Sequence, residues 1–109
     1  MSLDVSAIAV TMLAAAKGVV GETWPATQTY FESETKIFAE RFASIAKLRA
    51  DGLITEFRAK RHIQFQKESW ETMLLAVAGL NQIMVEEALN AALAAVSDVV
   101  NAAMGFALL

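Results

Sequence analysis

The sequence predicts an all-α protein: an antiparallel helical hairpin with an extra N-terminal helix and a long C-terminal helix, assembled into an oligomeric helical bundle. Apolar residues recur with helical spacing along most of the chain. Two short breaks that contain glycine divide it into three segments, at about residues 3–17, 25–50 and 54–106. The 109 residues are enough for one domain, so we expect a single helical domain over 1–109.

The first segment, at about residues 3–17, is rich in alanine, which favours helix. Gly18 and Gly21 end it, since glycine is the usual residue after a helix C-terminus. The apolar run Ala7–Ala16 has the length of a signal-peptide core. However, no basic residue precedes it, and Asp4 stands where a positive charge belongs. We therefore expect a short buried helix.

The second segment begins near Pro25, which suits the first helical turn because its missing N–H is not needed there. The large apolar side chains of this segment share one broad face, as expected for an amphipathic helix: Tyr30, Phe31, Ile37, Phe38, Phe42, Ile45 and Leu48. Asp51 and Gly52 form the strongest turn signal in the chain, and Thr55 can cap the following helix. So short a connection makes the two helices antiparallel neighbours.

The third segment, at about residues 54–106, changes the side of its apolar face. Its first part has Ile54, Phe57 and Phe65 on one face, and from Trp70 onward the apolar residues lie on the other side. One straight helix cannot direct both faces at one core, so it either kinks near Lys67–Trp70 or Gly79, or its halves face different partners. A helix of about 50 residues would be about 75 Å long, twice the second segment. The excess length predicts packing from another chain.

The composition also predicts a partner. Hydrophobic residues make up 56% of the chain and charged residues 19%, against roughly 45–50% and 25% in typical domains. A small domain can bury only part of such a surplus, so another subunit or a membrane must cover the rest. The predicted oligomer interface is the apolar face of the third segment: Trp70, Leu74, Val77, Met84, Ala88, Ala92, Val96, Val99 and Phe106.

Charge is distributed unevenly along the chain. The net charge of −3 gives no support to nucleic-acid binding. Seven of the nine Lys and Arg residues lie within Arg41–Lys67, and none follows Lys67. The predicted anion or partner patch consists of Arg58, Lys60, Arg61 and Lys67, which can dock phosphate, anionic lipid or an acidic protein. The alternative is a solvated helix face with weak surface pairs.

Glu34 and Arg41 fall within the apolar arc of the second segment, seven residues apart. Buried charges are costly unless they are paired. One hypothesis is that the two residues pair, within one chain or across a dimer axis, and set the register of association. The other interpretation places them at the rim of a broad arc, with their charged ends in water.

The residues needed for most catalytic and metal sites are missing. The absence of cysteine excludes disulfides, thiolate metal sites and Cys nucleophiles. His62 is the single histidine and lies beside Arg61, while Ala59 stands where a Glu-x-x-His motif would need its glutamate. We therefore predict no catalytic residue, metal or cofactor. Three carboxylates remain as possible ligands across a symmetric interface: Glu32, Glu34 and Glu40.

These patterns predict a non-enzymatic structural, assembly or adaptor protein. It would form a homo-oligomeric helical bundle, bind a further protein, and lie in the cytoplasm or in a larger bacterial or phage complex. The alternative is a membrane-associated protein that inserts its apolar C-terminal helix. Residues 88–109 are long enough to span a bilayer, but Asp98 would be buried there at a cost of about 2.5–3.5 kcal/mol. A ferritin-like metal-binding bundle is the third candidate.

Overall fold

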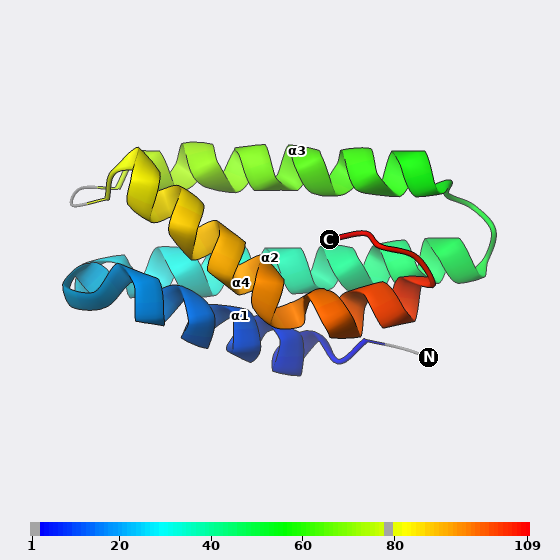
Figure 1. Ribbon diagram of the computed structural model, residues 1–109, viewed down its shortest axis with the longest axis horizontal. Coiled ribbons are helices and arrows are strands. Elements are labelled where there is room, and N and C mark those ends of the chain that lie inside the picture. Colours follow the sequence, from blue (N-terminus) through cyan, green and yellow to red (C-terminus); the bar gives the residue numbers. More distant parts are fainter. Residues whose placement is uncertain (1–2, 78–79) are drawn as a thin grey trace.

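The computed structural model describes residues 3–77 and 80–109 and shows a bundle of helices (Figure 1). In chain order they are α1 (Val5–Val20), the 3-10 turn η1 (Gly21–Thr23), α2 (Trp24–Ala50), α3 (Glu56–Leu75) and α4 (Gln82–Met104). Helices α1, α2 and α3 run in alternating directions along the long axis of the bundle, and α4 crosses it diagonally. The described residues contain no strand, and the all-helical bundle predicted from the sequence is confirmed.

One glycine marks the end of α2, and polar side chains cap the first turns of α3 and α4. Gly52 has a φ of 69°, which places the chain reversal after α2 in the left-handed region that favours glycine. Thr55 then caps α3, because its Oγ1 accepts a hydrogen bond of 3.1 Å from the backbone N–H of Arg58. Asn81 caps α4 in the same way: its Oδ1 accepts from the N–H of Met84 at 2.9 Å. The predicted turn and the predicted Thr55 cap are both present.

The segment at about residues 54–106, predicted as one long and kinked helix or as two halves with different partners, is two separate helices. Helix α3 runs unbroken through residues 67–70 and ends at Leu75, and α4 starts at Gln82 and runs back along the bundle. The other predicted kink site, Gly79, lies outside the described residues. Because the chain reverses here, its longest dimension is 43 Å rather than about 75 Å. The excess length that predicted a second chain is therefore absent.

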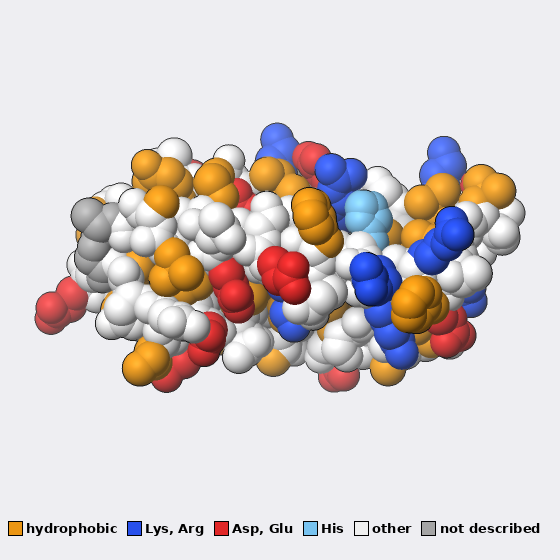
Figure 2. All heavy atoms as spheres, turned by 90° about the horizontal axis from the view of Figure 1, so that it is seen from above, with side chains coloured by type: hydrophobic (Ala, Val, Ile, Leu, Met, Phe, Trp, Pro, Cys, Tyr) orange, Lys and Arg blue, Asp and Glu red, His pale blue; other side chains and the backbone are white. Residues whose placement is uncertain are grey.

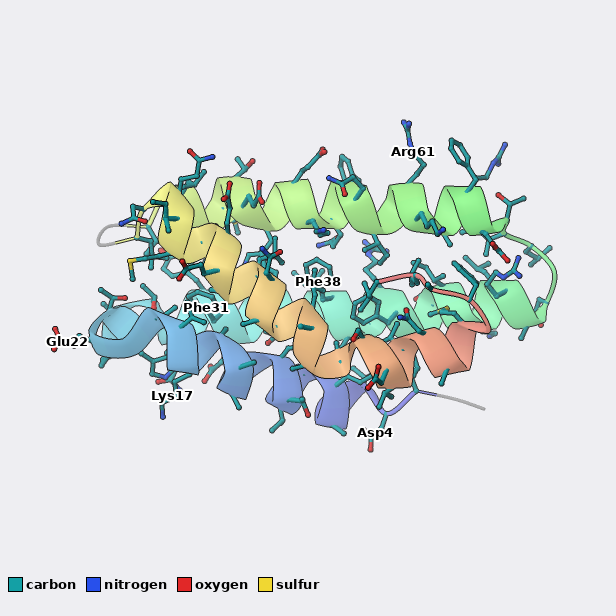
Figure 3. All side chains as sticks on the ribbon, in the orientation of Figure 1. Asp4, Lys17, Glu22, Phe31, Phe38 and Arg61 are labelled. Carbon is teal, nitrogen blue, oxygen red and sulfur yellow. The ribbon has the colours of Figure 1, made fainter. Side chains whose placement is uncertain are left out.

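A row of aromatic rings fills the centre of the bundle between α2 and α3. Trp70 of α3 lies between Phe31 and Phe38 of α2, with ring centroids 6.0 Å and 5.2 Å away. Trp24 extends the row beyond Phe31 at 5.4 Å, and Phe42 extends it beyond Phe38 at 5.7 Å. Figure 3 shows Phe38 pointing from α2 into the space beneath α3. Large rings in offset and edge contact bury much apolar area, so this row holds α3 on α2.

Helix α4 packs most closely on α1. Its apolar face includes the small residues Ala88 and Ala92, both fully buried, which allow the two helices to approach closely. The whole buried face of α4 repeats at helical spacing and consists of Val85, Ala88, Leu89, Ala92, Leu93, Val96, Val100 and Met104. The apolar C-terminal segment therefore forms a large part of the chain's own core.

Candidate functional site

The rotation of α3 about its axis decides which of its side chains meet water. Its buried residues, Ala59, Ile63, Trp70 and Leu74, all lie on one face. Because α3 is continuous through residues 67–70, this one inward face holds for its whole length. The kink near residues 67–70 that would turn Phe57 and Phe65 toward the same core is absent, so these two residues lie on a second apolar side of α3.

Phe57 and Phe65 instead point outward, with 70% and 68% of their surface exposed. We call the exposed stripe opposite the buried face the outer face of α3: Phe57, Arg58, Arg61, Phe65, Glu68, Thr72 and Leu75. Figure 3 shows Arg61 pointing away from the bundle. Two exposed phenylalanines on one helix face are unusual for surface residues and mark a candidate site of interaction.

The residues of the predicted oligomer interface lie mainly inside the chain. Val77, Met84 and Phe106 are half-buried, Val99 of α4 is 58% exposed, and the others are buried in the core: Trp70, Leu74, Ala88, Ala92 and Val96. The chain exposes 6273 Å², close to the roughly 5,900 Å² of a folded monomer of this mass. The fold thus places most of this apolar face between its own helices.

The predicted basic patch is divided between two sides of α3. Arg58 and Arg61 belong to the outer face, and the Arg61 guanidinium lies 5.9 Å from the ring centre of Phe57. Lys60 and Lys67 instead border a groove between α3 and α4. The sequence placed the four charges together because they are close in the chain, whereas the helix directs them to two different surfaces.

Basic and acidic side chains are concentrated toward opposite ends of the molecule. In Figure 2, which looks down on the α3 side, most Lys and Arg side chains gather toward the end with the turn between α2 and α3. Asp and Glu side chains are more frequent in the other half. On the outer face itself, Arg58 and Arg61 precede Phe65, and Glu68 follows it. The outer face is therefore basic at one end and acidic at the other.

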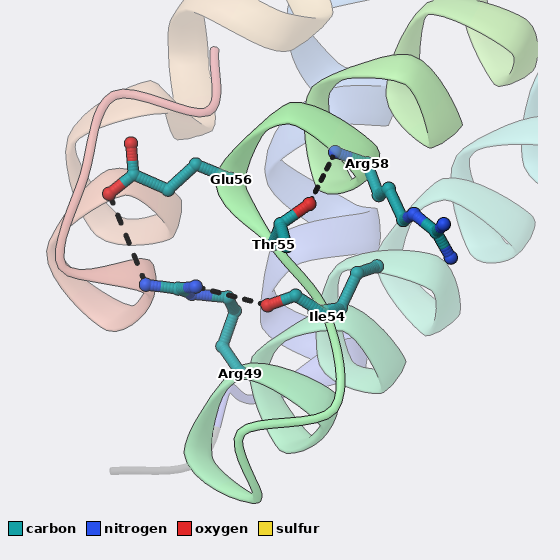
Figure 4. A network of polar contacts seen from close by, with 5 residues as sticks. All are labelled: Arg49, Ile54, Thr55, Glu56 and Arg58. Carbon is teal, nitrogen blue, oxygen red and sulfur yellow. Dashed lines mark hydrogen bonds and ion pairs between the residues drawn. The ribbon is translucent and has the colours of Figure 1, made fainter.

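Arg49 connects the turn between α2 and α3 to the residues that follow α4. Its Nη1 donates a 3.0 Å hydrogen bond to the carbonyl oxygen of Ile54, and its Nη2 lies 4.0 Å from Oε1 of Glu56 (Figure 4). Its guanidinium also lies 5.2 Å from the ring centre of Phe106. Sequence reasoning missed the contact of Arg49 with Phe106, because these two residues lie far apart in the chain.

Glu34 and Arg41 do not form an ion pair within the chain; among the described residues the one ion pair joins Arg49 and Glu56. Arg41 is exposed, while Glu34 is only 4% exposed. Burial raises the pKa of the Glu34 carboxyl, because desolvation disfavours its charged form. Pairing of the two residues across a dimer axis stays a prediction.

Neither a metal site nor a membrane segment is established by the structure. Within the described ranges, no three His, Cys, Asp or Glu side chains come together to hold a metal ion. The stretch Val5–Ala50, from α1 through α2, contains one 18-residue window apolar enough to cross a membrane by length and composition, with 22% of it buried. Core helices of soluble proteins and signal sequences pass the same test. Insertion of α4 would remove the core's own side chains, and Asp98 is exposed on that helix.

Comparison of the chain with protein-family models, with curated proteins and with solved structures gives no match.

Proposed function

We propose that this protein is a non-catalytic assembly module that pairs with a second copy of itself through the outer face of α3. The observation that supports the proposal is the exposure of Phe57 and Phe65 on a helix whose inward face is fixed by Trp70 and Leu74. The fold cannot bury these two rings by turning α3, because Trp70 would then leave the aromatic row. A second chain can cover them. Buried aromatic side chains supply most of the binding energy in many protein interfaces.

The order of charges on the outer face favours an antiparallel pair. In a two-fold dimer the same surface is used by both copies, so residue i contacts j and j contacts i. An axis near Phe65 brings Arg61 of each copy close to Glu68 of the other. It also brings Phe57 close to Leu75, which is 46% exposed. A parallel pair would set like charges opposite one another, so the charge order selects the antiparallel arrangement.

An anionic membrane is the competing partner for this face. Leu53, Phe57 and Arg58 all point to solvent near the turn that precedes α3, and exposed apolar groups beside basic ones suit a lipid surface. Glu68 lies on the same stripe and would be repelled by anionic headgroups. A second copy satisfies both the aromatic and the acidic part of the face, so we favour it.

Mass measurement by size-exclusion chromatography with light scattering, in buffer without detergent, tests the proposal. We expect a dimer for the natural sequence and a monomer for Phe65→Asp, because the variant places two carboxylates beside the axis. Val10→Asp is the matched control. Val10 is 66% exposed, but it lies on α1, on the other side of the bundle from α3. This variant should stay dimeric.

A monomeric natural protein, or a dimer that Phe65→Asp leaves intact, would overturn the proposal. A natural protein that is monomeric in buffer and floats with anionic vesicles, with flotation lost in Phe65→Asp, would assign the face to a membrane instead.

A further inference from the structure

A groove of about 500 Å³ lies between α3, α4 and the chain that follows α4. Its floor is apolar: Ile63 comes from α3, Leu93 from α4 and Leu108 from the C-terminal segment, and all three are buried. Figure 1 shows this segment returning between α3 and the end of α4. The groove has the size of sites that hold small ligands.

Asn101 holds the C-terminal wall of the groove in place. Its Oδ1 accepts hydrogen bonds from the backbone N–H groups of Leu108 and Leu109, both at 2.9 Å. Its Nδ2 donates to a backbone oxygen of Leu109 at 3.3 Å. Gly105 allows the chain reversal, with a φ of 79°. The wall is therefore formed before any ligand arrives, which lowers the entropy lost on binding.

The rim of the groove is positively charged. Lys60 and Lys67 lie on it two helical turns apart, and Gln64, Asn90 and Ser97 add neutral polar groups. None of the ten lining side chains is acidic. Within the described part of the chain, neither lysine has an acidic partner within 4.0 Å. An anion between the two ammonium groups would gain charge-assisted hydrogen bonds.

We propose that this groove binds a small amphipathic anion, with its headgroup at Lys60 and Lys67 and its hydrocarbon chain over Ile63, Leu93 and Leu108. The rim and the floor of the groove favour different chemical groups. An inorganic anion would make no use of the apolar floor, and an uncharged hydrocarbon would supply no counter-charge to Lys67 or to Lys60, whose ammonium lies 6.0 Å from the ring centre of Phe106. The site is independent of the proposed dimer, because no residue of the outer face of α3 lines the groove.

Calorimetric titration of the full chain with decanoate, below its micelle concentration, tests the site. We expect saturable binding of one decanoate per chain, and roughly tenfold weaker binding of decanol, which lacks the charge. Lys60→Met and Lys67→Met should each weaken decanoate binding several-fold and leave decanol unchanged. Ala94→Trp, which fills the groove from the exposed side of α4, should abolish both. Lys47→Met, at an exposed position on α2, is the matched control and should bind like the natural protein.

Several results would overturn the inference. They are no binding of decanoate, equal affinity for decanoate and decanol in the natural protein, or binding that the two lysine variants do not affect. Inorganic phosphate that binds as tightly as decanoate would also overturn it, because the floor would then play no part. Binding to anionic vesicles without binding to monomeric decanoate would assign the lysines to a lipid surface. Circular dichroism of each variant separates loss of the groove from loss of the fold.

Discussion

Helix α4 is the more apolar of the two C-terminal helices, yet α3 carries the larger aromatic surface in contact with water. The apolar face of α4 lies in the core. Its large exposed apolar residues, Ile83 and Val99, lie far apart along the helix. On α3, Phe57 and Phe65 share one stripe with charges of both signs. The apolar content of a helix therefore does not identify a binding surface, whereas the apolar area left exposed after folding does.

The largest expected effect is on stability, and it should differ between a residue on the buried face of α4 and a residue on the outer face of α3. Leu89→Ala should lower the free energy of unfolding by about 2–5 kcal/mol, because it leaves a cavity in the core. Phe65→Ala should change it by no more than about 0.5 kcal/mol when the chain is kept dilute and monomeric. Urea unfolding followed by circular dichroism measures both. Equal losses would show that Phe65 is part of the core and would remove the contrast between the two helices.

The next effect is a dependence of stability on pH, and it concerns the face of α2 on which α3 packs. Glu34 lies in α2 between Phe31 and Phe38, whose rings both contact Trp70. Since the pKa of Glu34 is raised, the folded state binds the proton more tightly than the unfolded state. Stability should therefore fall as the pH rises from the ordinary glutamate pKa, about 4.3, through the raised value, and stay lower at neutral pH.

Glu34→Gln should remove this fall in stability with pH. At pH 7 it should raise the free energy of unfolding by on the order of 1 kcal/mol. Urea unfolding at a series of pH values from 4 to 8 measures it. Glu40→Gln is the control, because Glu40 is exposed on the same helix. A similar pH dependence in the natural protein and the Glu34→Gln variant would show that the Glu34 carboxyl is not the cause.

The last effect tests the direction of the proposed α3 pair. Arg61→Glu and Glu68→Arg should each weaken the dimer roughly two- to thirty-fold, because each replaces two surface charge pairs with repulsive ones. The double variant should regain most of the affinity, since it restores opposite charges across the interface. Sedimentation equilibrium at low salt measures the dissociation constants. Additive losses in the double variant would exclude the antiparallel arrangement.

Much of the fold follows from local signals in the sequence. Gly52 and Thr55 define the turn before α3 because a positive φ and an N-cap each favour few residue types. The row of Phe31, Phe38 and Phe42 follows from helical spacing. The reversal between α3 and α4 did not follow, because residues 76–81 contain no proline and the apolar pattern continues on both sides.

The candidate site was harder to predict for a different reason. Phe57 and Phe65 satisfy the usual pattern for a buried helix face, so sequence reasoning could not decide whether they meet the core or a different partner. Ala59 and Ile63 are buried instead, because Trp70 and Leu74 further along the same straight helix set its rotation. A helix has one inward face, and which face it is depends on contacts with α2 that lie far away in the sequence.

The aromatic row between α2 and α3 also gives this protein an internal optical probe. Its two tryptophans, Trp24 and Trp70, are both buried, and Trp70 is completely enclosed. Neither belongs to the outer face of α3 or to the groove. Tryptophan emission therefore reports on the integrity of the bundle, and it should stay unchanged when the two copies of the proposed dimer separate, so it distinguishes unfolding from dissociation.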